Sequence, residues 1–176
     1  LSTSLYRNAL YLILSGTGVS FFGFIFWIVA ARLYSEETVG LSSAIISAVN
    51  LMALLGSIGL NFTLIRYLSG AERPRQFINA SLVLSILASL AVAGVFIAGT
   101  SLWSPALNLL KNNALFCLGF LAIVVFSTSS NLISSVFIAR LRAGFVLSKD
   151  MIFSIVRIPL LAVLVFLLGA SGLVAS

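Results

Sequence analysis

Long uncharged stretches, separated by short segments that carry the charges, dominate the pattern of residues along this chain. Four stretches contain no Asp, Glu, Lys or Arg and a fifth contains one Arg: residues 8–31, 38–65, 76–110, 112–139 and 151–176. A helix rises about 1.5 Å per residue, so about 20 residues cross a hydrocarbon layer of about 30 Å. In lipid the backbone must satisfy its own hydrogen bonds, which segments of this length do as helices. The pattern therefore predicts membrane-spanning helices near 8–31, 41–67, 77–100, 114–138 and 151–169.

Composition agrees with a membrane location. Hydrophobic residues make up 61% of the chain, charged residues make up 8%, and the mean hydropathy is +1.21. A soluble domain carries about 25% charged residues. A cleaved signal peptide is the weaker alternative for the first span, because a signal h-region has about 7–15 apolar residues and this run is longer.

The two ends of the chain suggest that it is one part of a larger membrane protein. It begins without Met, and "LLGASGLVAS" resembles the close of the fifth span, a turn at 169–172 and the first residues of another helix. We expect an all-α fold, a polytopic transmembrane helix bundle with about five spans plus the start of a sixth. Residues 1–176 then form a single membrane domain.

The basic residues predict how this domain is oriented. Eight lie at the N-terminus and at or near the second-to-third and fourth-to-fifth connections: Arg7, Arg66, Arg73, Arg75, Arg140, Arg142, Lys149 and Arg157. Only Arg32 and Lys111 lie on the opposite side. Lys and Arg near span ends concentrate on the cytoplasmic side, so we expect a multi-pass protein of the cytoplasmic membrane with its N-terminus inside. These residues are spread over short loops without an aromatic stripe, so nucleic-acid binding is not favoured.

The sequence offers little material for catalysis. It has no His and a single Cys, Cys117, so neither a disulfide nor a His/Cys metal site can be built within the chain. The predicted spans contain no carboxylate, and no nucleophile is paired with a base. We therefore predict no enzyme activity, no catalytic residue, no cofactor and no metal.

Small and polar residues within the spans have two interpretations, helix packing and a hydrated cavity. Gly16 and Ser20 form a small-xxx-small pair, which favours close helix packing. In the second span, Gly56, Gly59, Thr63 and Arg66 are spaced so that they share one helical face. The fourth span contains seven hydroxyl or amide side chains between 127 and 135, more than packing alone requires.

The segment "ARLYSEETVGLSSAIISAVNLMALLGSIGLNFTLIRYL", residues 31–68, resembles the start of the polysaccharide/O-antigen flippase family. That family belongs to the multidrug/oligosaccharidyl-lipid/polysaccharide exporter superfamily. Its members typically show an Arg leaving the first helix, a "LGPEEFG"-like outer turn and a helix ending "LGL…RY". The matching positions here are Arg32, Glu37, Gly40, Gly59, Leu60, Arg66 and Tyr67. Ser35, Glu36 and Val39 depart from the loop motif and leave its spacing intact.

The resemblance implies a fold of about 12–14 helices in two lobes, of which this chain is most of the N-terminal lobe. It also implies a flippase that moves lipid-linked oligosaccharide or polysaccharide precursors, on a polyprenyl phosphate-type carrier, by alternating access. Its partners are then this substrate, membrane lipids and the missing C-terminal lobe. Arg suits a phosphate, and Ser and Asn suit sugars. The candidate binding residues are Arg66, Arg157, Arg7, Asn50, Ser127 and Asn131.

Two other functions remain alternatives. A cation-coupled multidrug exporter of the same superfamily generally uses a carboxylate in its N-terminal lobe, which these predicted spans lack. A non-transporting membrane scaffold would have all its small-residue faces packed. Arg157 has a second interpretation as well, because a long side chain near a span end can reach lipid phosphates at the interface.

Overall fold

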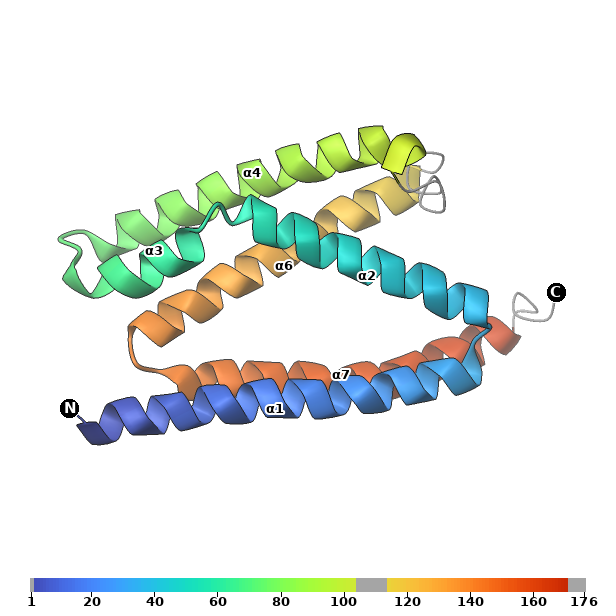
Figure 1. Ribbon diagram of the computed structural model, residues 1–176, viewed down its shortest axis with the longest axis horizontal. Coiled ribbons are helices and arrows are strands. Elements are labelled where there is room, and N and C mark those ends of the chain that lie inside the picture. The colour runs from blue at the N-terminus through green and yellow to red at the C-terminus, as the bar shows by residue number, and fades with distance from the viewer. Residues whose placement is uncertain (1, 104–113, 171–176) are drawn as a thin grey trace. The chain divides into compact units, whose positions relative to one another are not determined.

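The computed structural model describes residues 2–103 and 114–170, and every secondary-structure element among them is helical (Figure 1). The elements are α1 (Ser2–Leu33), α2 (Glu36–Gly56), α3 (Leu60–Tyr67), the 3-10 helix η1 (Leu68–Gly70), α4 (Pro74–Trp103), α6 (Ala114–Ala139) and α7 (Ala143–Ala170). The all-α fold expected from the sequence is confirmed.

Among the described residues, four helices are long and apolar enough to cross a membrane: Leu5–Leu33, Glu36–Gly56, Pro74–Leu102 and Ala114–Ala139. They correspond to the first four predicted spans. The fifth predicted span, 151–169, falls within the 28-residue helix α7 and remains a prediction as a span. The start of another helix after residue 172 lies outside the described residues.

The chain divides into two compact units, and each is described by itself. The first, called here the α1–α7 pair, consists of residues 1–39 and 141–176. Its two long helices lie side by side (Figure 1). Asn8 contacts Ala143 and Ser15 contacts Asp150, and both contacts join residues 135 positions apart. Because the difference in residue number is the same for both contacts, α1 and α7 run parallel and keep one register.

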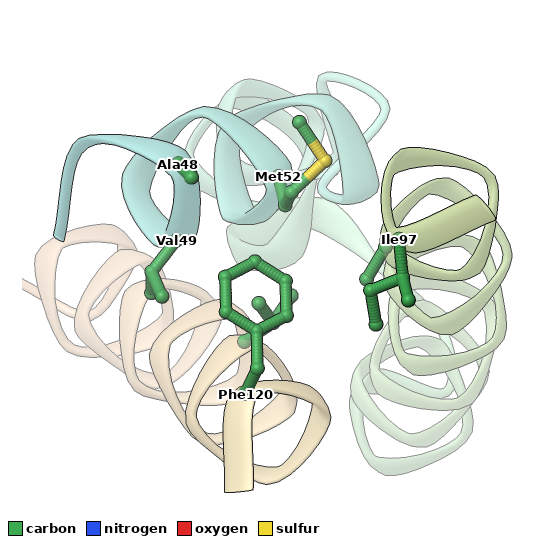
Figure 2. Packing of buried hydrophobic residues seen from close by; sticks show 7 residues of the cluster. Ala48, Val49, Met52, Ile97 and Phe120 are labelled. Carbon is green, nitrogen blue, oxygen red and sulfur yellow. The ribbon is translucent and has the colours of Figure 1, made fainter. Parts of the chain in front are cut away.

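The second unit, called here the α2–α6 unit, covers Gly40–Arg140. Its main core joins α2, α4 and α6. Figure 2 shows Phe120 of α6 pointing towards residues of the other two helices, and the ring of Phe120 stacks on Phe96 with centroids 5.9 Å apart. A second, smaller core lies under α3. The buried residues of the main core are Ala48, Val49, Met52, Ala93, Ile97, Phe120 and Val124. Those of the smaller core are Leu64, Leu68 and Leu132.

The predicted second span, 41–67, is not one continuous helix. The chain leaves the helical path at 57–59, where Ile58 and Gly59 have φ of 47° and 72°. Gly56 is the last residue of α2, and a Cβ placed on it would lie 2.5 Å from Cβ of Ser89 in α4. This approach is possible only without a side chain, and the left-handed conformation at 59 favours glycine. The shared face expected for Gly56, Gly59 and Thr63 therefore does not form.

Candidate functional site

The α2 helix has a buried apolar face and an exposed face that carries both polar and apolar residues. Its buried residues, among them Val49 and Met52, lie on the side that packs in the core. Ser47 and Asn50 are exposed, and the spacing of about 100° per residue puts them on the side of the helix away from Met52. Asn50, a predicted sugar contact, therefore does not take part in the core of its unit.

The polar residues of α6 divide between packing and exposure. Thr128 and Ser135 are buried, and each donates its hydroxyl to a carbonyl of its own helix, Val124 at 2.9 Å and Asn131 at 3.1 Å. The Asn131 side chain is exposed and Ser127, one turn earlier, is half-buried. Packing explains Thr128 and Ser135, whereas the face with Ser127 and Asn131 stays open.

A polar stripe on α4 was missed by the sequence analysis. Ser81, Ser85 and Ser89 recur every four residues and are buried in the α2–α6 unit. Ser89 donates to the carbonyl of Ile86 at 2.9 Å, and Oγ of Ser85 has no hydrogen-bond partner among the described residues. The four-residue spacing was the available signal, and it indicates a close helix contact.

Arg157 lies on the side of α7 that faces α1. Its guanidinium carbon is 4.9 Å from the ring centroid of Phe26, and Nη2 would be 3.2 Å from a Cβ placed on Gly23. Nε is buried and has no hydrogen-bond partner within the described part of the chain. A cation over an aromatic face is attracted by the ring quadrupole. Phe26 and Gly23 thus lie against the guanidinium, and its buried Nε has no hydrogen bond to the described residues.

The two remaining predicted arginines have different surroundings. Arg66 is exposed at the end of α3, with its guanidinium carbon 5.5 Å from the ring centroid of Tyr67. Arg7 is exposed near the start of α1 and lines a cavity of about 500 Å³ that lies wholly in the α1–α7 pair. Of the six predicted residues, Arg7 and Arg157 belong to this pair, whereas Asn50, Arg66, Ser127 and Asn131 belong to the α2–α6 unit.

The α1–α7 pair contains two polar contacts that the sequence did not reveal. Buried Ser15 donates its hydroxyl to Oδ2 of Asp150 at 2.5 Å, and Asp150 also forms an ion pair with Lys149 at 3.3 Å. Buried Asn8 accepts the backbone N–H of Ala143 at 2.8 Å. Asp150 lies seven residues inside α7, because that helix begins earlier than the predicted span.

Within the described residues, no group of three or more His, Cys, Asp or Glu side chains is arranged to hold a metal ion. Cys117 is half-buried and free.

A family model described as polysaccharide biosynthesis protein matches residues 5–176, which is nearly the whole chain. No curated protein and no solved structure matches the chain.

Proposed function

We propose that this chain, which belongs to the polysaccharide biosynthesis protein family, works as a flippase for lipid-linked oligosaccharide or polysaccharide precursors in the cytoplasmic membrane. Such a substrate bears a phosphate and many hydroxyl groups, and transferring these unpaired into hydrocarbon is costly. A protein that moves it must offer a polar path for the head while the lipid tail stays in the bilayer. Alternating access supplies that path from each side in turn.

One observation carries the proposal: exposed amides on helices long enough to cross a membrane. Asn50 on α2 and Asn131 on α6 are exposed, and both lie off the packed faces of their helices. An unpaired amide in hydrocarbon costs about 4–8 kcal/mol on an alkane scale, so these side chains are expected to meet water or sugar hydroxyls. Asn50, Ser127 and Asn131 are the proposed sugar contacts. A scaffold with every polar face packed accounts less well for them.

Arg157 is the proposed contact for the substrate phosphate. Its guanidinium lies against Phe26 and Gly23, and Nε has no partner among the described groups. An arginine within a span normally faces a partner, a cavity or the interface. Arg66 is proposed as a further phosphate contact, because it is exposed at the end of α3.

The polar face can be tested with cysteine variants of the full-length protein in which Cys117 is replaced. Asn131→Cys and Phe126→Cys both change exposed positions of α6; Phe126 is 70% exposed and apolar. A membrane-impermeant thiol reagent is expected to label position 131 and not 126, since a thiol reacts only where water ionises it. Equal protection of both positions would contradict a hydrated path beside α6.

The proposed orientation has its own labelling test. With the N-terminus inside, Glu36→Cys should react with an impermeant reagent added outside the cell, and Glu72→Cys should be spared. The bias of basic residues to one side supports this orientation. Labelling of position 72 alone would reverse it.

Transport itself is tested by reconstituting the protein in vesicles and measuring flipping of a lipid-linked oligosaccharide. Arg157→Leu is expected to insert normally and lose about ten-fold or more of its transport, because a hydrogen bond to a charged group contributes about 1.5–3 kcal/mol. Arg157→Lys should restore part of the rate, and Arg140→Leu, in the exposed connection before α7, is the matched control. A reduced protein level with normal transport per molecule would assign Arg157 to lipid anchoring instead.

A further inference from the structure

The cavity of about 500 Å³ at the start of α1 and α7 has a mixed cationic and apolar lining. Its polar lining residues include Arg7, Arg142 and Ser148. Its apolar lining residues include Tyr11, Leu141 and Phe145, of which Phe145 is 57% exposed. All these residues belong to the α1–α7 pair, so the cavity is complete within one unit.

Both guanidinium groups of this cavity are free to take an anion. Among the described residues, neither Arg7 nor Arg142 forms an ion pair, and the carboxylate of Asp150 is already occupied by Lys149 and Ser15. Two arginines on one cavity offer several donors to the oxygens of a single phosphate. The cavity is therefore cationic without a counter-charge from the described residues.

The backbone around the cavity strengthens this charge and holds it in place. Helix α7 begins at Ala143, directly after Arg142, and a helix N-terminus carries a partial positive charge. The N–H of Ala143 is bound by Asn8, whose side chain is only 7% exposed. This bond ties the first turn of α7 to α1, beside Arg7. Arg7 and Arg142 each directly precede one partner of this bond, so the bond keeps their backbone positions together.

The apolar residues in the lining of the cavity favour an amphiphile over a free anion. A free phosphate would use the arginines and leave Tyr11, Leu141 and Phe145 in water. A glycerophospholipid would place its phosphate at the arginines and its acyl chains along the apolar residues. Basic pockets between membrane helices bind anionic lipid head groups in this way.

We propose that this cavity is a binding site for the phosphate of an anionic glycerophospholipid that stays with the protein. The assignment differs from the sequence-based role of Arg7 as a contact for the transported lipid. It does not rest on the proposed flippase activity, because a resident lipid is bound whether or not substrate moves.

The test uses native mass spectrometry of the purified full-length protein titrated with phosphatidylglycerol and, separately, with phosphatidylcholine of the same acyl chains. We expect phosphatidylglycerol to bind at least about ten-fold more tightly, since only it keeps a net charge for the arginines. Arg7→Gln and Arg142→Gln should each weaken it about ten-fold, as expected for loss of a charge-assisted hydrogen bond. Arg140→Gln removes the same charge two residues away, outside the cavity, and should leave binding unchanged.

A second variant covers the case in which the glutamine variants do not fold. Ser148→Phe keeps both arginines and fills the cavity from an exposed position, so it should reduce phosphatidylglycerol binding while the protein level stays normal. Equal affinity for the two phospholipids, or unchanged binding in Ser148→Phe, would overturn the proposal. So would displacement of phosphatidylglycerol by millimolar inorganic phosphate, which would indicate a free-anion site. Displacement by an equimolar polyprenyl phosphate would reassign the cavity to the substrate.

Discussion

The α1–α7 pair and the α2–α6 unit hold their helices together by different means. In the pair, polar groups meet across the two helices: Asn8 with Ala143 and Ser15 with Asp150. In the α2–α6 unit, the buried hydroxyls of Thr100 and Ser135 donate to carbonyls of their own helices, and apolar cores join the helices. The buried Ser15 of the pair thus bonds across to the other helix, whereas the buried Thr100 and Ser135 bond within their own helices.

The difference shows how register is set between helices in lipid. Burying apolar side chains gives little advantage there, because lipid tails are as apolar as leucine. The pair obtains its register from directional hydrogen bonds. The α2–α6 unit obtains it from close backbone approach, as at Gly56 and Ser89. Three substitutions test this contrast, each with a counterpart in which the effect should be absent.

The largest effect is expected for Gly56→Leu in the α2–α6 unit. A Cβ at this position would lie 2.6 Å from the Cα of Ser89, so α2 and α4 must separate. Overpacking of this kind costs about 3 kcal/mol. Thermal unfolding in detergent should show a clearly lower midpoint than the parent protein. Gly94→Leu, at an exposed position of α4 with no atom within 4 Å of its Cβ, should unfold close to the parent. Equal loss in both variants would contradict register by close approach.

A smaller loss is expected for Asn8→Ala in the α1–α7 pair. The substitution leaves the N–H of Ala143 without the side-chain acceptor that lies 2.8 Å away, at a buried site. An unsatisfied buried donor costs about 1–3 kcal/mol. Unfolding in mixed detergent micelles would measure the change. Asn8→Asp keeps an acceptor oxygen and should retain most of the stability. If the Asp variant is as unstable as the Ala variant, the hydrogen bond to Ala143 does not account for the loss of stability.

The smallest effect is expected for single hydroxyl deletions, compared between the units. Ser15→Ala removes a bond to the carboxylate of Asp150 and should cost about 1.5 kcal/mol, the lower end for bonds to charged groups. Ser135→Ala removes only a bond to its own helix, and alanine has the higher helix propensity by roughly 0.5 kcal/mol. The Ser135 variant should therefore unfold like the parent. A double-mutant cycle with Asp150→Asn would show whether the Ser15 effect depends on the carboxylate.

The sequence by itself was enough for the fold class and most of the spans. Crossing hydrocarbon demands about 20 uncharged residues in a helix, and that demand leaves a pattern visible without any tertiary contact. For the same reason the polar set of α6 was apparent, because polar residues in such a helix stand out against their neighbours. The sequence could not show which polar side chains of α6 are buried, such as Thr128, and which are exposed, such as Asn131.

Only the tertiary structure decided the features that depend on a second helix. The helix is interrupted after Gly56, where Ser89 of α4 packs closely against it. The sequence of residues 41–67 does not predict this contact with α4. Arg157 contacts Phe26 because α1 and α7 run parallel in a register 135 residues apart, as the Ser15–Asp150 bond shows. The hydropathy of a segment indicates whether that segment lies in lipid or in water, and it does so for each segment separately. Pairing between segments depends on shape and on individual hydrogen bonds, which exist only once the helices have met.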